Sequence, residues 1–254
     1  MKKEEEKRLF LFEYKDSTVE GELLWESHCH ARYEMIAVIE GDITVIFEGK
    51  PYRLKGGQCA VISPLSYHII NANRQGRYRR VTALFDTEAI PAPLRSSFFE
   101  GKKEIYILSF PQGEALAEIC ESEDAALYAP LAESIMVQLL YAIYKMGRTA
   151  PTAQVDETLA KMLSFVDAHL CEPIRLSEIA ASAALSVSSV SHIFREKMKI
   201  SPKQYILRKK LALASKLIGE GTSPTDAALF VGYEDYSNFY RMYRKQFEKK
   251  PTEL

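Results

Sequence analysis

The feature that most constrains this sequence is an amphipathic helical pattern that occurs twice in its last third. Ala227-Ala228 matches Ile179-Ala180 at an offset of 48 residues, and Tyr243 matches Phe194 at an offset of 49. The turn within the second copy is therefore one residue longer than the turn within the first. A repeat of this kind predicts two small helical units of the same fold.

Each copy predicts two short helices joined by a tight turn. In the first copy, we expect a helix over Leu176–Ala183 with Ser177 as its N-cap, a turn at Ala184-Leu185, and a second helix over Val187–Met198 capped by Ser186. One face of that second helix is apolar at helical spacing, with Val190, Ile193, Phe194 and Met198. This pattern is typical of a helix-turn-helix unit, whose second helix enters the major groove of DNA.

Two further helices are expected around the repeat. Thr158–Leu170 precedes the first copy, and Pro202–Ile218 connects the two copies and carries Arg208-Lys209-Lys210 on its flank. Between Ser191 and Lys250 there are 13 basic and 6 acidic residues, although the whole chain has a net charge of −1. A basic segment attached to an acidic remainder is typical of a DNA-binding module, although a solvated helical face is the simpler alternative.

The length of 254 residues is sufficient for two domains, with a boundary in the small and polar stretch Gly147–Ala153. We therefore expect one domain over residues 1–150 and a second over 151–254. No apolar stretch approaches the ~20 residues of a membrane helix, and the four cysteines lie far apart. These features favour a cytoplasmic protein with reduced thiols.

The first half contains short apolar runs separated by turn residues, which predicts an antiparallel sandwich or barrel. The runs are Met35–Ile39, Ile43–Phe47, Ala60–Ile62 and Val81–Phe85. At about residues 114–146 the pattern becomes helical, and we expect two helices interrupted near Pro130. These helices are candidates for a homodimer interface, with packing against the barrel as the alternative.

Three of the five histidines lie close to a glutamate in this half. If residues 28–40 form one strand, His28, His30 and Glu34 project from the same face, and His68 could complete the group. Two imidazoles and a carboxylate suit a metal site, the lining of a ligand pocket, or a purely structural network. We favour the effector pocket, and we expect no bound metal, no cofactor and no catalytic residue.

The motif around these histidines resembles the cupin fold. His28, His30, Glu34 and Gly41 follow the pattern H-x-H-x3-E-x6-G. The second cupin motif is looser, because Pro64 and His68 are one residue closer together than in the metal-binding pattern and no glycine follows two positions after Pro64.

The second half resembles the DNA-binding domain of the AraC/XylS family of bacterial transcription regulators. The resemblance covers about Asp156 to Leu254, and it is carried by Ser186–Pro202 and Ala227–Lys245. It implies a two-domain α+β protein, with an N-terminal cupin-like β-barrel with following helices and a C-terminal all-α domain of two helix-turn-helix units. This sequence departs from the family pattern at three positions. The family usually has glycine in place of Lys199 and Glu248, and arginine in place of Lys210.

The resemblance and the helical geometry together predict the residues that contact DNA. In the first recognition helix these are Ser188, Ser191, His192 and Arg195; in the second they are Tyr236, Ser237, Tyr240, Arg241, Arg244 and Lys245. Arg244 and Lys245, together with Lys203 and Lys209, are expected to meet phosphates.

These observations predict a sequence-specific regulator of bacterial promoters, controlled by a small molecule bound near His28, His30, Glu34 and His68. Its expected partners are double-stranded promoter DNA, the effector and a second copy of the chain, and RNA polymerase is a further partner that such a regulator could contact. We expect neither an enzyme nor a membrane protein. The competing hypothesis is a metal-dependent cupin enzyme fused to a DNA-binding module.

Overall fold

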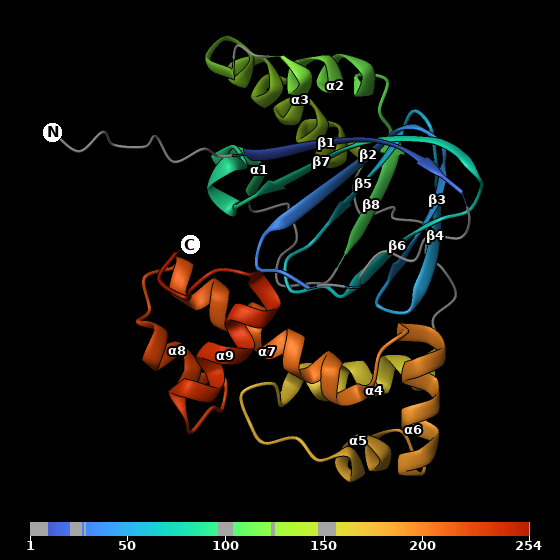
Figure 1. Cartoon of the computed structure of the whole chain (residues 1–254). Coiled ribbons are helices and arrows are strands. Elements are labelled where there is room, and N and C mark those ends of the chain that lie inside the picture. Colours follow the sequence, from blue (N-terminus) through green and yellow to red (C-terminus); the bar gives the residue numbers. More distant parts are fainter. Residues whose placement is uncertain are drawn as a thin grey trace, which may run out of the picture.

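The computed structural model describes residues 10–20, 27, 29–95, 104–122, 125–146 and 156–253. His28 and the expected boundary stretch 147–153 lie outside these ranges. Every described strand precedes Phe110, and the described residues from 156 onward form helices and turns (Figure 1). The predicted two-part α+β architecture is therefore confirmed. No described helix is both long and apolar enough to span a membrane.

The N-terminal part is an antiparallel barrel built from two sheets. The larger sheet has the order β1-β7-β2-β5-β8 and the smaller has the order β4-β3-β6. The strands are β1 Phe10–Val19, β2 Tyr33–Glu40, β3 Asp42–Phe47, β4 Lys50–Lys55, β5 Gln58–Ile62, β6 His68–Ala72, β7 Gly76–Phe85 and β8 Ile105–Ser109. Gly41 joins β2 to β3 at a φ of 114°, and a Cβ there would lie 3.0 Å from the Tyr78 ring.

Alternation along the strands gives the larger sheet two apolar faces. In β2, Ile36 and Val38 point between the two sheets, whereas Met35 and Ala37 point outward. Helices α2 (Gly113–Glu121) and α3 (Ala125–Met146) cover the outward face (Figure 1). The expected interruption at Pro130 is wrong, because α3 runs through Pro130 and the break falls between α2 and α3. Two short elements, η1 (Thr87–Ala89) and α1 (Ala92–Arg95), follow β7.

The C-terminal helices follow the predicted pattern closely. They are α4 Glu157–Ala168, α5 Leu176–Ser182, α6 Val187–Ile193, a π-helical turn η2 Phe194–Met198, α7 Pro202–Gly219, α8 Pro224–Phe230 and α9 Tyr236–Phe247. Ser186 caps α6 as expected, since its hydroxyl accepts the Ser189 N–H at 3.1 Å. Ser177 is not the cap of α5, which begins after Arg175, and the Glu178 carboxylate accepts the Arg175 N–H at 2.7 Å.

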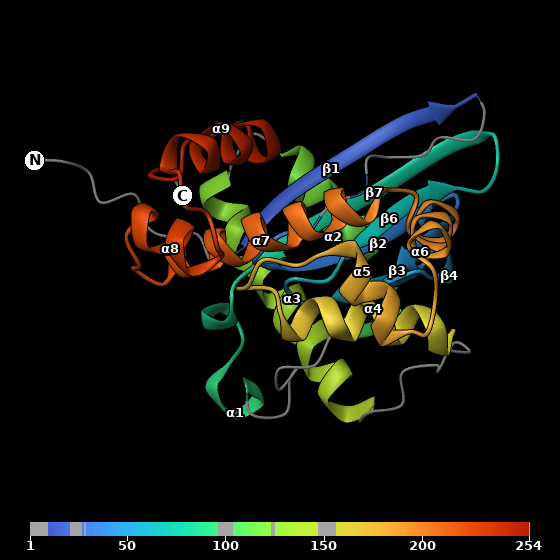
Figure 2. The ribbon, with the colours of Figure 1, turned by 90° about the horizontal axis from the view of Figure 1, so that it is seen from below.

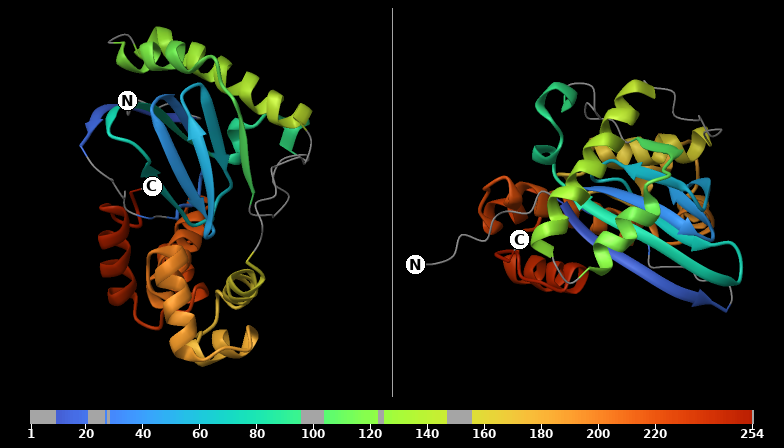
Figure 3. Two further views of the ribbon diagram at one scale, coloured as in Figure 1. Left: turned by 90° about the vertical axis from the view of Figure 1, so that its right-hand side faces the viewer. Right: turned by 90° about the horizontal axis from the view of Figure 1, so that it is seen from above.

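Helix α7 connects the two helix-turn-helix units, with α5, α6 and η2 toward one end and α8 and α9 at the other (Figures 1 and 2). The core of the second unit is formed by α7, α8 and α9, around Phe239 and Tyr243. The core of the first unit also includes Cys29, Tyr67 and Ile69 from the barrel. The first unit is therefore packed directly against the N-terminal part (Figure 3).

Candidate effector and DNA-binding sites

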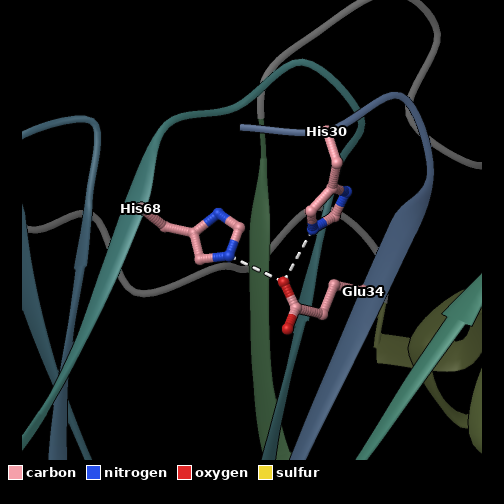
Figure 4. A group of neighbouring side chains, drawn as sticks. All are labelled: His30, Glu34 and His68. Atoms are coloured by element: carbon pink, nitrogen blue, oxygen red, sulfur yellow. Dashed lines mark hydrogen bonds and ion pairs between the residues drawn. The ribbon is translucent and has the colours of Figure 1, made fainter. Parts of the chain in front are cut away.

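Two histidines converge on one carboxylate at an end of the barrel. His68 begins β6 and is fully buried, Glu34 lies in β2, and His30 precedes β2. Oε2 of Glu34 is 2.6 Å from Nε2 of His68 and 2.8 Å from Nε2 of His30 (Figure 4). The expected strand over 28–40 is wrong, because β2 begins at Tyr33 and the preceding bend, rather than strand parity, brings His30 to Glu34. His28 lies outside the described residues.

The other nitrogen of each imidazole fixes the tautomer of the ring. Nδ1 of His30 lies 2.8 Å from the Arg32 carbonyl oxygen, and Nδ1 of His68 lies 3.1 Å from that of Ser66. A carbonyl oxygen only accepts, so both Nδ1 atoms donate and both Nε2 atoms turn toward the carboxylate. An Nε2 atom without its proton and a carboxylate oxygen are both acceptors, so a proton or a cation must lie between each such pair.

The donor set fits a divalent transition metal. One ligand atom from each of His30, Glu34 and His68 lies within 4.8 Å of the others. Imidazole and carboxylate ligands suit such ions, and backbone carbonyls that hold the second ring nitrogen are typical of metal-ligating histidines. These three residues would hold the ion, which would act there as a Lewis acid. The expectation that no metal binds stays a prediction.

The inner face of β7 adds polar groups that the sequence analysis did not select. Tyr78 and Thr82 are buried, and the register places Thr82 opposite Ile36 of the inner core. Within the described ranges, Oγ1 of Thr82 has no hydrogen-bond partner. Burial raises the pKa of Tyr78, while the nearby positive charge of Arg80 opposes that rise. The alternation of Tyr78, Arg80 and Thr82 along β7 was a signal available in the sequence.

The first recognition helix presents its expected DNA-binding face to solvent. Ser188, His192 and Arg195 are exposed, and Ser191 is half-buried. The Ser191 hydroxyl donates to the Val187 carbonyl at 3.1 Å, and His192 lies 3.6 Å from Glu196. The opposite face is buried through Val190, Phe194 and Met198, as expected.

The second recognition helix, α9, also has an exposed polar face and a buried apolar face. Its expected contact residues are exposed, apart from the half-buried Tyr240; they are Tyr236, Ser237, Tyr240, Arg241, Arg244 and Lys245. The helix is capped by Asp235, which accepts the Ser237 N–H at 2.9 Å. The Arg241 guanidinium donates to Asn238 Oδ1 at 3.1 Å, which holds it along the exposed face. These contacts with DNA stay a prediction.

The basic flank of α7 does not face DNA as expected. Lys209 is 1% exposed, and its ammonium group donates to the Leu65 carbonyl of the barrel. Arg208 donates to the Ser27 hydroxyl at 2.8 Å, and Lys210 donates to the Val231 and Glu172 carbonyls at 2.8 and 3.0 Å. The predicted phosphate contact of Lys209 is therefore wrong, whereas Lys203 is exposed.

A β-barrel joined to two helix-turn-helix units on a shared helix defines this chain as a two-domain DNA-binding regulator. A family model described as a helix-turn-helix domain matches residues 179–254. The C-terminal part is similar to the DNA-binding domain of AraC/XylS-type transcription regulators, and the N-terminal part is cupin-like, as the sequence motifs predict. This family and fold imply a non-enzymatic role.

Similar proteins support this assignment. The transcriptional activator RhaS of Klebsiella pneumoniae is 23% identical over 251 residues, covering 89% of this chain and 86% of that protein. LumQ of Photobacterium leiognathi, a probable transcriptional regulator, is 33% identical over 90 residues, covering 35% of this chain and 36% of its own.

Two solved structures are also similar to this chain. ToxT from Vibrio cholerae O395 is 12% identical with a TM-score of 0.45, covering 97% of each chain. A probable AraC family transcriptional regulator from Rhodopseudomonas palustris is 27% identical with a TM-score of 0.36, covering 39% of this chain and 94% of its own.

Proposed function

We propose that this regulator binds promoter DNA through α6 and α9 in two successive major grooves, under the control of a small molecule bound in the barrel. The observation that carries this proposal is the pair of recognition helices near the two ends of α7, each with an exposed polar face and a buried apolar face. Successive major grooves are about 34 Å apart along one face of a duplex. Two linked units therefore specify a longer DNA sequence than either unit alone.

The effector site proposed is the His30–Glu34–His68 cluster, with the inner face of β7 beside it. Because three acceptor-type atoms meet there, the cluster favours an effector that brings positive charge or hydrogen-bond donors. An amine, a polyol or a divalent cation meets this requirement. The runner-up, a metal-dependent cupin enzyme, is favoured only by the fit of the three ligand atoms to a metal.

The remaining parts of the proposal concern organisation and location. We propose a sensor domain over residues 1–150, a DNA-binding domain over 151–254, a cytoplasmic location, no enzymatic activity, and contact with RNA polymerase at the promoter. The packing of the first unit against the barrel supports one communicating molecule rather than two independent modules.

DNA recognition is tested by selecting bound sequences from a random DNA pool with purified protein at two salt concentrations. The expected result is a motif with two informative blocks about one helical turn apart. Salt-sensitive binding without sequence preference would contradict the proposal, because it would mean that phosphate contacts alone hold the DNA.

Effector binding is tested by the melting temperature in the presence of polyols, amines and divalent cations, each added separately. A ligand that binds only the folded state raises the melting temperature. The Glu34→Gln variant is expected to lose that rise, whereas Glu114→Gln, in the exposed part of helix α2, should keep it. A rise of the same size in Glu34→Gln would place the ligand elsewhere.

We also propose that a second copy of the chain binds along α3. The face of α3 toward the sheet is covered by Met136, Leu140 and Ile143, which lie in the outer core. Its other face leaves Val137, Tyr141 and Tyr144 exposed at helical spacing. Analytical ultracentrifugation should show a dimer that Tyr141→Glu dissociates, and a wild-type monomer at micromolar concentration would contradict this part.

A further inference from the structure

A single loop touches both the histidine cluster and the DNA-binding part. This 63–67 loop, Ser63 to Tyr67, connects β5 to β6. On one side, the Ser66 carbonyl accepts the hydrogen bond from His68 Nδ1 at 3.1 Å, and the Leu65 N–H donates to the His30 carbonyl at 2.9 Å. The loop backbone therefore bonds directly to both histidines.

On its other side, the same loop bonds to the first helix-turn-helix unit. The Leu65 carbonyl accepts from Lys209 of α7, and the Tyr67 hydroxyl donates to the Met198 carbonyl at 3.1 Å. The Tyr67 ring meets the Tyr205 ring edge to face at a centroid distance of 5.4 Å. Two residues of the loop, Leu65 and Tyr67, thus hold both η2 and α7.

Because Lys209 is charged and buried, its hydrogen bond to the Leu65 carbonyl depends closely on where the loop lies relative to α7. Lys209 lies 3.2 Å from Asp167 Oδ1 and 3.9 Å from Glu48 Oε1, and it is almost fully buried. The two oxygens of Glu48 are also held, since they accept the Tyr67 N–H and the Tyr205 hydroxyl at 2.9 Å each. A buried ammonium group is strongly destabilising unless it keeps its partners.

We propose that the 63–67 loop transmits occupancy of the histidine cluster to the first helix-turn-helix unit. This inference rests on the proposed function, in which that cluster binds the effector. An effector that reorients the His68 imidazole changes its hydrogen bond to the Ser66 carbonyl, and one that displaces His30 shifts the backbone carbonyl that accepts from Leu65. Leu65 already has a φ of 58°, so the loop is in a strained conformation held by its surroundings.

The coupling follows from the buried ammonium group. When the Leu65 carbonyl moves, Lys209 keeps its hydrogen bond to that carbonyl only if α7 moves with it, so two loop positions correspond to two placements of the first unit. An effector that binds one loop position more tightly shifts this equilibrium. Among the described residues, the core of the second unit contains none from the barrel, so we expect that unit to respond through α7.

Hydrogen exchange measured by mass spectrometry on the full chain tests the path without a ligand. Glu34→Gln removes the negative charge of the carboxylate with little change in side-chain shape. Amide exchange in residues 63–68 and 196–209 is expected to rise at least fivefold, while exchange in 236–247 stays unchanged. His30→Gln is the second variant, because His30 is only partly buried and its replacement disturbs the barrel less. Changes confined to the barrel, or equal in both units, would overturn the proposal.

A double-mutant cycle provides the second test, with DNA affinity measured on a sequence obtained from the random-pool selection. Glu34→Gln and Lys209→Met are expected to be non-additive by at least threefold in Kd, since both act through the 63–67 loop. Lys203→Met is the matched control on the exposed face of α7, and its effect should add to that of Glu34→Gln. An additive Lys209→Met cycle would overturn the proposal. If the wild type binds no specific sequence, the proposed function fails, and hydrogen exchange alone then decides the role of the loop.

Discussion

The two helix-turn-helix units share one sequence pattern but differ in what completes their cores. The first unit is closed on one side by the barrel, through Cys29, Tyr67 and Ile69. The second is closed by its own helices and by α7, and Tyr243 donates to the Ser215 hydroxyl of α7 at 3.0 Å. A repeated fold can therefore have unequal roles, because only the first unit shares a core with the sensor part.

Lys210 connects the two units directly. Lys210 of α7 donates to the Val231 carbonyl in the turn of the second unit and to the Glu172 carbonyl beside the first. Burial lowers the pKa of Lys210, as expected for an ammonium group removed from water. The lysine that replaces the family's usual arginine thus still ties the two units together.

The largest expected effect is the loss of a core aromatic ring from one unit. Phe239→Ala should destabilise the second unit by about 3–5 kcal/mol, because it leaves a cavity in a small core. Hydrogen exchange should then rise in α8 and α9 while α4, α5 and the 63–67 loop stay protected. Phe194→Ala in the first unit should instead expose that loop as well. If both variants loosen the same segments, the two cores are not independent.

A smaller effect is expected for sequence recognition. Arg241→Ala should remove the information from one block of the selected DNA motif, at a cost of about 1–3 kcal/mol for the preferred base pair. Ser188→Ala is the counterpart in the first unit and should cost less, since a serine hydroxyl bonds to several base edges. Competition binding with single base changes measures both. A uniform loss of affinity for all sequences in Arg241→Ala would instead indicate a phosphate contact.

The ends of the two recognition helices are equivalent, which permits a matched test of stability. Lys199 and Glu248 both adopt the left-handed conformation that favours glycine, with φ of 56° and 57°. Lys199→Gly and Glu248→Gly should each stabilise the protein by about 0.5–1 kcal/mol in urea unfolding, as relief of strain exceeds the added entropy of the unfolded chain. Gly232→Ala, at a φ of 83°, should have the opposite sign. A loss of stability in either glycine variant would contradict this account.

The sequence was sufficient to predict the helices and the barrel because both depend on local periodicity. Val190, Phe194 and Met198 are buried as their spacing predicts. The missing glycines at Lys199 and Glu248 did not prevent the left-handed helix ends, since packing on both sides outweighs a penalty of about 1 kcal/mol. The break predicted at Pro130 failed for a related reason, because the packing of α3 against the sheet outweighs the backbone hydrogen bond that a proline inside a helix removes.

The sites depend on long-range contacts, which local patterns do not encode. His30 and His68 were predicted correctly as neighbours of Glu34. For His30, however, the reason given, which was shared strand parity with Glu34, is wrong. Lys209 looked like any other basic residue on a helix flank, and only the docking of the barrel onto α7 reveals that it is buried. Sequence alone cannot separate these cases, because a lysine on an exposed face and one at a domain interface have the same helical position.

The smallest expected effect concerns the carboxylate of Asp156, which lies in the first unit. Asp156 caps α4 by accepting the Thr158 and Leu159 N–H groups, and it pairs with Lys197 of η2. The hydrogen bond from Lys197 holds the pKa of Asp156 below its ordinary value of 3.8. Asparagine keeps the cap but loses the ion pair, so Asp156→Asn should cost about 0.5 kcal/mol, since the pair is partly exposed and screened by solvent.

The pH dependence of the free energy of unfolding distinguishes the Asp156–Lys197 ion pair from the capping of α4 by Asp156. A carboxyl whose pKa is depressed in the folded state stabilises that state fully above its unfolded pKa, and the contribution is lost as the pH falls through the folded pKa. The difference between wild type and Asp156→Asn in urea unfolding should therefore be constant from pH 7 to 5 and shrink toward pH 3. Asp235→Asn is the control in the second unit, where the carboxylate caps α9 through the Ser237 N–H. A difference for Asp156→Asn that persists unchanged at pH 3 would mean that Lys197 contributes nothing through charge, and the contact between α4 and η2 would then depend on packing alone.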